Sequence, residues 1–384
     1  MITVADVVRG LDELAPFVLA EPWDNVGLLW GDPSAPVARA MTCLTVCSRT
    51  AAEAIRERAQ LIISHHPVLF REVKQVRSDS PENGFLWSLA RFGVSVASPH
   101  TAFDNAAGGI NDLLCQKLGM VDLEPLRPMT RTAAAPPRRY KVIVFTPSGD
   151  REVVMQAAFE AGAGRIGAYA ECSFATAGEG TFLGDASTHP TIGQAGRRET
   201  VAELRLEFVC SEHRLAAVLA TIRARHSYEE PAIDVYPLEE EPHAMRALGA
   251  GRVGRLHEPR ALGEFARLVA ATLESDSVQV VGEFARPVKR IAVACGAGDD
   301  FLHDARRSGA DVLLTGEARY HRGLESQELG LALITAGHHA TERPGVVDLA
   351  ARLGAAFPDL VVWPSHDEHD PFQTPPAVAA APHQ

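Results

Sequence analysis

Long hydrophobic runs, clustered cysteines and an excess of positive charge are all missing from this chain of 384 residues. No apolar run reaches the roughly 18 residues that a membrane-spanning helix requires. Residues 1–6 lack a basic segment followed by an apolar one, so we expect no signal peptide and a cytoplasmic location. The six cysteines show no CxxC spacing and are too sparse for a disulfide scaffold, which predicts reduced thiols.

Two further classes of function lack support in the sequence. A formal net charge of −12 argues against general binding of nucleic acid, which depends on basic patches that neutralise phosphates. No GxSxG motif is present, and no pattern joins the cysteines to histidines, so nothing indicates a nucleophilic serine or cysteine. A GxGxxG match at residues 162–167 follows a predicted helix and precedes a predicted strand. A dinucleotide-binding loop needs the reverse order, so we interpret these glycines as a helix end and a turn.

A pair of adjacent histidines ends a short apolar run in the first third of the chain. Residues 61–64 predict a buried strand, and Pro67 prevents its simple continuation, so His65 and His66 should lie where the strand becomes a loop. A strand at 40–46 and a helix at 50–60 precede this strand and predict a β-α-β unit. The pair alone fits a metal site and a hydrogen-bonded strand end about equally well.

Polar side chains follow two other predicted strands in the same way. His100 and Asp104 come after the strand at 94–97, and a second histidine pair, His338 and His339, comes after the strand at 331–334. The recurrence suggests two related α/β halves. If a helix begins at Thr341 and Glu342, His338 and Glu342 can lie on one face, because they are four residues apart.

A different order of elements separates these halves. Residues 127–139 have the proline-rich composition of a linker, and residues 140–237 predict the β-α-β-β-α-β order of a ferredoxin-like module. The acidic run at 239–242 predicts a solvated linker. We therefore expect three domains: an α/β metal-binding half, an inserted module and a second α/β metal-binding half, at residues 1–128, 138–240 and 248–384.

The candidate ligands form a mixed nitrogen and oxygen set that suits zinc, iron or manganese. The set comprises His65, His66, Asp104, His338 and Glu342. Five ligands suffice for two neighbouring ions if a carboxylate bridges them and water fills the open positions, and such a pair supports metal-assisted hydrolysis. His100, His321 and His339 could orient ligands or transfer protons, although each alone is more often structural.

Two polar segments favour a structural interpretation. The turn-rich residues 21–28 are typical of a structural loop. The ligand-rich residues 366–370 lack a preceding strand and loop, so we expect a solvated tail or an intersubunit contact.

Several motifs in order resemble the Nif-three-like dinuclear metal centre family, whose members are commonly labelled GTP cyclohydrolase type 2 homologues. These motifs are Trp23-Asp24-Asn25-Val26-Gly27-Leu28, Ser64-His65-His66-Pro67, His100-Thr101 with Asp104, Gly108-Gly109-Ile110-Asn111-Asp112, Thr315-Gly316-Glu317 with His321, and Gly337-His338 with Thr341-Glu342. The resemblance covers nearly the whole chain. It implies the same five metal ligands, with Glu342 as the bridge, and a homo-oligomer in the form of a toroidal hexamer with metal pairs facing a central cavity.

The inserted module resembles the insert of longer family members, which is similar to the PII and CutA trimeric proteins and would cap the hexamer. Its motifs are Gly164-Arg165-Ile166-Gly167, Gly178-Glu179-Gly180-Thr181-Phe182 and His226-Ser227-Tyr228-Glu229-Glu230-Pro231-Ala232. Two residues depart from the family: Thr45 stands where many relatives carry aspartate, and Ser227 where they carry proline. Neither is a predicted ligand.

Two functions therefore compete. The first is a metal-dependent hydrolase that acts on a small phosphorylated or nucleotide-like substrate. The second is a metal-handling or regulatory scaffold protein without turnover of its own, in which the insert senses a ligand or partner. Catalytic roles for His100 and His321 belong to the first.

Overall fold

The protein folds into two compact units, each described by itself. The computed structural model describes residues 1–129, 138–167, 169–238 and 248–374. One unit comprises residues 1–134 and 243–384, and the other residues 135–242. None of the helices in the described ranges is long and apolar enough to cross a membrane.

The two expected linkers are only partly covered. The first ends at Arg139, where a strand of the insert begins, but its residues 130–137 lie outside the described residues. The acidic run at 239–242 lies wholly outside them.

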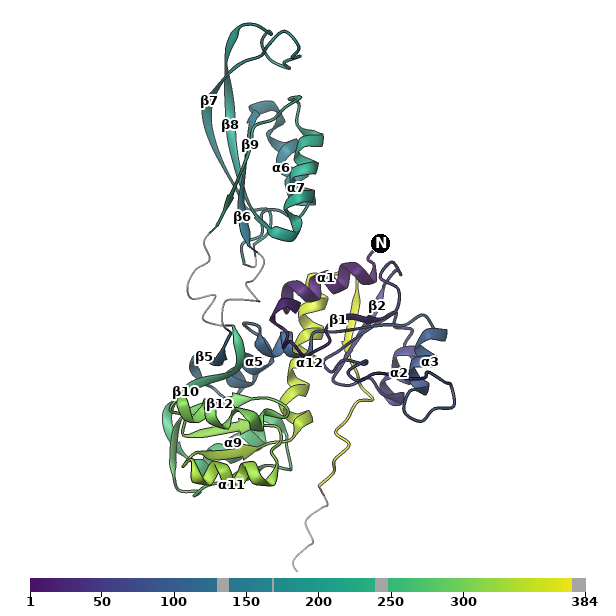
Figure 1. Ribbon diagram of the computed structural model, residues 1–384, viewed down its shortest axis with the longest axis vertical. Helices are drawn as coiled ribbons and strands as arrows, with labels where there is room; N and C mark the ends of the chain where they lie inside the picture. Colours follow the sequence, from purple (N-terminus) through teal and green to yellow (C-terminus); the bar gives the residue numbers. More distant parts are fainter. Residues whose placement is uncertain (130–137, 168, 239–247, 375–384) are drawn as a thin grey trace, which may run out of the picture. The chain divides into compact units, whose positions relative to one another are not determined.

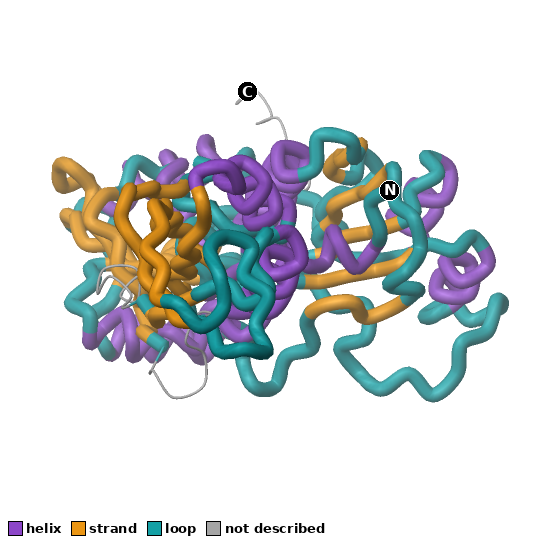
Figure 2. Tube along the Cα trace, turned by 90° about the horizontal axis from the view of Figure 1, so that it is seen from above, coloured by secondary structure: helices purple, strands orange, loops and turns teal. Residues whose placement is uncertain are grey.

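The larger unit contains a five-stranded sheet near the N-terminus. Its strands, in spatial order, are β1 (Gly27–Trp30), β4 (Ser95–Ser98), β3 (Leu61–Ser64), β2 (Arg39–Cys43) and β15 (Val361–Pro364). All pairs are parallel except β1 with β4. Every residue of β3 is buried, as the apolar run predicts, and β2 and β3 form the expected parallel β-α-β unit. Figure 2 shows strands running side by side near the N-terminus with helices around them.

The larger unit also contains a six-stranded sheet. Its strands, in spatial order, are β11 (Gln279–Val281), β14 (Ala332–Thr335), β13 (Val312–Thr315), β12 (Pro287–Ala294), β10 (Gly249–Ala261) and β5 (Val121–Pro128). The central β12, β13 and β14 are parallel, and the strands outside them pair antiparallel. β10 was not predicted, because its glycine-rich and charged sequence shows no apolar alternation.

Helices cover both sheets. They are α1 (Val4–Leu14), α2 (Ser48–Arg56), α3 (Gly84–Arg91), α4 (His100–Asn105), α5 (Ile110–Lys117), α9 (Leu262–Leu273), α10 (Leu302–Arg307), α11 (Tyr320–Glu328) and α12 (His338–Ala356), with the short 3-10 helices η1 (Phe17–Leu19) and η3 (Gly298–Phe301). Thr3 caps α1 through a capping box with Asp6.

The two sequence halves exchange strands. β15, from the C-terminal half, pairs with β2 in the first sheet, whereas β5, from the N-terminal half, pairs with β10 in the second. A boundary at residues 128 and 248 therefore separates the halves along the chain but not in space.

Helix α12 joins the two sheets. It starts directly after β14 and ends near the N-terminal sheet, where Leu349 and Leu353 pack in one core with Leu61 and Ile63 of β3. Figure 1 shows α12 between the part that holds β2 and α3 and the part that holds β12 and α9. The helix begins at His338, so the expectation that the second histidine pair enters a loop is wrong.

The insert has the predicted ferredoxin-like topology. Its elements are β6 (Arg139–Pro147), η2 (Ser148–Asp150), α6 (Arg151–Glu160), β7 (Ser173–Leu183), β8 (Arg198–Ser211), α7 (Glu212–Arg225) and β9 (Ile233–Pro237). The antiparallel sheet has the order β7-β8-β6-β9, and both helices contribute to its buried core. Residues 162–167 lie between α6 and β7, which confirms that the GxGxxG match does not open a helix. A strand predicted near residues 168–174 overlaps β7 only at its start. Most residues of β7 are exposed, so the strand has no alternating apolar face that the sequence could reveal.

The ligand-rich segment after β15 is bound to the rest of the unit, so the prediction of a solvated tail is wrong. The carboxylate of buried Glu53 on α2 accepts hydrogen bonds from Ser365 Oγ and from the backbone N–H groups of His366 and Asp367. Glu368 accepts from the backbone N–H groups of Leu44 and Thr45 at 2.8–2.9 Å. Glu368, which the sequence suggests is solvated, thus binds backbone donors after the end of β2.

Replacing Glu53 with glutamine is expected to lower the free energy of unfolding at neutral pH by about 1.5–3 kcal/mol, the range for a buried hydrogen bond to a charged group. Burial alone would raise the pKa of Glu53, but the hydrogen bonds from Ser365, His366 and Asp367 outweigh it and lower the pKa. This stabilisation is therefore present above the ordinary glutamate pKa and is lost as the pH falls through the lowered value. The variant should lose less stability on acidification than the wild type.

Denaturant unfolding followed by tryptophan fluorescence measures this difference. All four tryptophans, Trp23, Trp30, Trp87 and Trp363, lie in the larger unit, so the signal reports on that unit alone. Glu57→Gln is the matched control, because Glu57 ends the same helix with its side chain 40% exposed. Equal stabilities of the Glu53 and Glu57 variants at all pH values would contradict the proposed role of Glu53.

Candidate metal centre

Three elements place the predicted ligands at neighbouring positions. His65 and His66 follow β3, Asp104 lies on α4 directly after β4, and α12 carries His338 and Glu342 in its first two turns. β3 and β4 are adjacent parallel strands, so both deliver side chains to the same edge of the sheet. The start of α12 reaches this edge from the other sheet. The structure thus brings all five predicted ligands together.

Glu342 lies at the centre of this cluster. One carboxylate oxygen, Oε2, is 3.1 Å from His66 Nε2 and 3.0 Å from His338 Nε2. The other oxygen, Oε1, is 3.9 Å from His65 Nε2, which itself lies 3.6 Å from Asp104 Oδ1. The two oxygens of one carboxylate therefore face two different groups of side chains.

Several polar atoms of the cluster lack a hydrogen-bond partner although they are buried. They include both ring nitrogens of His65 and Glu342 Oε2, which has two imidazole nitrogens close by without hydrogen-bond geometry. Buried polar atoms without partners are costly, and convergent imidazole nitrogens and carboxylate oxygens are the ligands that a divalent transition metal binds. The residues present therefore fit a metal ion.

Burial and charge shift the pKa values of four of these side chains, in different directions. Burial lowers the pKa of His65 to about 3, so its imidazole is neutral and its lone pair is free to bind a cation. Burial would raise the pKa of Glu342, but the imidazoles of His338, His65 and His66 outweigh this effect and hold the pKa well below its usual value. Contact with Glu342 raises the pKa of His338 to about 9. Burial, and then the charge of Glu342, raise the pKa of Asp104 to about 7.

His100 also belongs to the cluster. Its ring lies 5.3 Å from that of His65 and 5.7 Å from that of His66, between ring centroids, and potential ligand atoms of these three histidines lie within 4.8 Å of one another. A second such group comprises His66, His338 and Glu342. His100, predicted as catalytic, therefore has the position of a ligand or of a proton donor.

Asp24 fixes the orientation of His100. Its buried carboxylate lies 2.7 Å from His100 Nδ1 and also accepts from the backbone N–H and the hydroxyl of Thr101. Burial opposes ionisation of Asp24, but these hydrogen bonds lower its pKa to about 2. The ionised carboxylate therefore accepts a hydrogen bond from the Nδ1–H group of His100, which leaves Nε2 without this partner. The interpretation of residues 21–28 as a merely structural loop is therefore wrong at Asp24. In the sequence, only the Trp23-Asp24 pair pointed to a role for this residue in the site.

Three residues that are not predicted ligands contact the predicted ligands. Thr45 Oγ1 lies 2.7 Å from His66 Nδ1, Glu317 Oε1 lies 3.1 Å from His338 Nδ1, and Cys295 Sγ lies 3.7 Å from Asp104 Oδ1. Partners of this kind orient a ligating side chain and fix its tautomer. Thr45, which departs from the expected family pattern, thus supports His66 through its hydroxyl.

Two glycines permit the close approach of the strands to α12. Gly337 has φ +92°, a conformation that residues with a Cβ rarely adopt, and it turns the chain from β14 into the helix that carries His338. A Cβ on Gly296 would collide with Glu342 Oε1 and approach His338 Nε2 at 3.2 Å. Side chains at these positions would displace the ligands.

Two other predicted histidines lie apart from these ligand groups. His321, on α11, is exposed, and its ring contacts that of Tyr320 at 5.5 Å between centroids. Burial lowers the pKa of His339, and the charges of Glu368 and Asp370 in the segment after β15 oppose this shift. Their proposed roles stay predictions.

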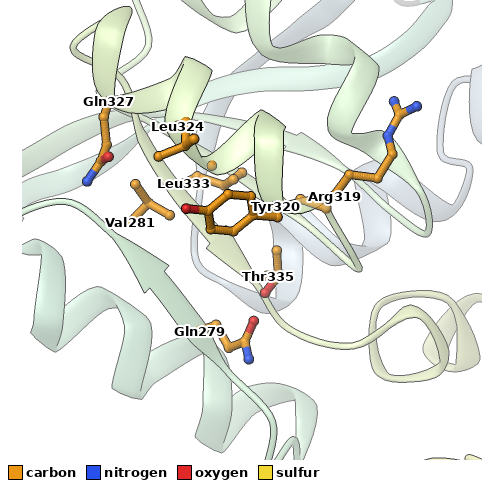
Figure 3. Close-up of a pocket in the computed structure, with 10 residues that line it drawn as sticks. Gln279, Val281, Arg319, Tyr320, Leu324, Gln327, Leu333 and Thr335 are labelled. Atoms are coloured by element: carbon orange, nitrogen blue, oxygen red, sulfur yellow. The ribbon is translucent and has the colours of Figure 1, made fainter.

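A pocket of about 380 Å³ opens beside Tyr320 between α11 and strands β11 and β14. Figure 3 shows Tyr320 lying between Leu324 and Thr335, whereas Arg319 points away from this group. The residues that line the pocket include none of the five predicted ligands. The pocket is therefore separate from the candidate metal centre.

The sequence matches the Duf34/NIF3 (NGG1p interacting factor 3) family over residues 2–371. A protein of Halalkalibacterium halodurans named GTP cyclohydrolase 1 type 2 homolog is 36% identical over 333 residues, which make up 87% of this chain and 87% of that protein. A Mycobacterium tuberculosis protein of the same name is 35% identical over 364 residues, 93% of this chain and 94% of that protein.

Solved structures share the fold along nearly the whole chain. A Bacillus cereus protein related to NIF3 superimposes with a TM-score of 0.73 at 31% identity, covering 97% of this chain and 99% of that one. A Staphylococcus aureus protein superimposes with a TM-score of 0.64 at 26% identity, with coverage of 97% and 99%. Such coverage includes the insert, which is therefore part of the shared architecture.

Proposed function

Because this chain belongs to the Duf34/NIF3 family, we propose that it binds two divalent metal ions and hydrolyses a small phosphorylated or nucleotide-like substrate. The convergence of three imidazoles on the two oxygens of Glu342, with Asp104 beside His65, supports the proposal. The name of the relatives, GTP cyclohydrolase 1 type 2 homolog, agrees with a nucleotide-like substrate.

We assign the bridge between the two ions to Glu342. Its Oε1 would serve the ion held by His65 and Asp104, and its Oε2 the ion held by His66 and His338. Mixed imidazole and carboxylate ligands suit zinc, iron or manganese. The adjacent histidines His65 and His66 would thus bind different ions instead of sharing one.

A pair of such ions, when bound, supplies a Lewis acid and lowers the pKa of water, which makes hydrolysis possible at neutral pH. The chain itself supplies proton transfer: Asp24 holds His100 through Nδ1, so His100 Nε2 is the atom that accepts or donates a proton beside the ligands. Thr45 and Glu317 hold the rings of His66 and His338 in place.

Assembly is part of the same proposal. By resemblance to the family, we expect a homo-oligomer, a toroidal hexamer in which the metal centres face a shared cavity. A small-molecule substrate would reach the centres through that cavity.

Metal analysis combined with hydrolysis assays tests the proposed function. We expect about two ions per chain and turnover of at least one member of a panel of nucleotides, phosphoesters and cyclic amides. Asp104→Asn should abolish turnover, whereas Asp122→Asn, at a carboxylate 62% exposed on β5, should retain it. Protein loaded with both ions yet inert across the panel would contradict the proposal.

A further inference from the structure

Two large aromatic side chains stand in the solvent beside the candidate metal centre. Trp23 is 62% exposed and Phe70 is 53% exposed, yet both contact the ring of His100, each at 6.1 Å between centroids. Trp23 and Phe70 also contact each other at 6.0 Å, edge to face. Through His100 these rings are continuous with His65 and His66, so a row of rings leads from solvent to the ligands.

The loops that carry these rings are fastened to each other and to α4. Asp24, next to Trp23, binds His100 and Thr101, and Asn25 Nδ2 donates to the carbonyl oxygen of Leu69 at 2.9 Å. These bonds hold the two loops, and the exposed rings themselves contact each other and His100. Exposed apolar side chains gathered at a polar site mark binding surfaces, and a surface held in place beforehand loses little entropy when a ligand binds.

We infer that Trp23 and Phe70 form a stacking surface for a planar heteroaromatic ring of the substrate. Trp23 and Phe70 contact each other edge to face and more than half of each residue's surface is exposed, so both rings offer aromatic surface to a ligand. Aromatic rings stack on planar nucleobases regardless of the base. A ring stacked there lies beside His100, with its substituents directed at the ligand cluster. This inference rests on the proposed function and narrows its substrate to molecules that carry such a ring.

Calorimetry with two matched probes tests the inference. Adenosine 5′-monophosphate carries a planar base, whereas ribose 5-phosphate has the same sugar and phosphate without one. Wild-type protein should bind the nucleotide about tenfold or more tightly than the sugar phosphate. Trp23→Ala should remove most of this difference by weakening nucleotide binding alone, and Trp23→Phe should restore much of it.

Trp87→Ala is the matched control, because Trp87 is 44% exposed on α3 and should leave both affinities unchanged. Equal binding of the two probes by wild type, or nucleotide binding unaffected by Trp23→Ala, would overturn the inference. Dissociation of an oligomer by Trp23→Ala would also overturn it, since a second copy of the chain would then cover the rings. An unchanged metal content shows that each variant is folded.

The design separates this inference from the proposed function, because binding is measured without turnover. If Asp104→Asn protein binds the nucleotide and Trp23→Ala weakens that binding, the stacking surface is supported even where no hydrolysis is found. If turnover of a substrate without an aromatic ring is found and Trp23→Ala does not affect it, hydrolysis stands and the stacking surface is refuted.

Discussion

Replacing Glu342 with glutamine is expected to remove most of the bound metal from the purified protein. Glutamine keeps one carbonyl oxygen but places an N–H₂ donor where the second oxygen faces an imidazole or a cation, and it removes the central negative charge. Loss of a residue that hydrogen-bonds to a metal ligand typically lowers metal affinity by about 10–100-fold. Loss of a ligand shared by both ions should lower metal affinity further. Elemental analysis and competition with a chelator measure the effect.

Glu317→Gln provides the matched control for this variant. Glu317 is 57% exposed and contacts the same helix through His338 Nδ1, but it lies outside the predicted ligand set. Its replacement should lower affinity by no more than about 100-fold. A Glu342→Gln protein that keeps both ions with the affinity of the wild type would show that Glu342 is not the bridge.

The positions of the candidate ligands could be predicted because each depends on local sequence. An apolar strand that ends in a histidine pair, and a His-Glu spacing that matches a helical turn, are patterns within a few residues. The structure brings His65, His66, His338 and Glu342 together accordingly.

The outer contacts could not be predicted, because their partners are far apart in sequence. Asp24 meets His100 across 76 residues, and Glu368 meets Leu44 across 324. From sequence alone, an aspartate in a turn fits two interpretations equally well: it can stabilise the turn locally, or it can bind an imidazole that is remote in sequence. Only the packing of the sheets decides between the two.

The exchange of strands between the two halves could not be predicted from the sequence for a related reason. The mixed polar sequences of β5 and β10 form an antiparallel pair at the edge of the second sheet, and their pairing brings together residues more than a hundred positions apart. Periodicity detects a strand by its buried face, and the outer part of β10, from Arg255 on, is largely exposed.

Arg252 of β10 is expected to be the most sensitive position for stability outside the metal centre. The side chain is 1% exposed, and its guanidinium binds both carboxylate oxygens of Asp112 at 2.7 and 2.8 Å. It also donates to the carbonyl oxygens of Gly249, Gly251 and Ala106, each at 2.7 Å. One side chain thus joins β10 to α5 and to the end of α4.

Arg252→Met should lower the free energy of unfolding by about 3–5 kcal/mol, because it leaves the Asp112 carboxylate buried without its counter-charge and three carbonyl oxygens without their donor. Denaturant unfolding followed by tryptophan fluorescence isolates the larger unit, since the insert contains no tryptophan. Arg255→Met is the control on the same strand: its ion pair with Asp122 is 46% and 62% exposed, so about 0–1 kcal/mol should be lost. Equal losses of unfolding free energy for the two variants would contradict this role of Arg252. The Arg252–Asp112 pair would then contribute no more than a surface ion pair, and packing of the sheets would hold β10 to α5.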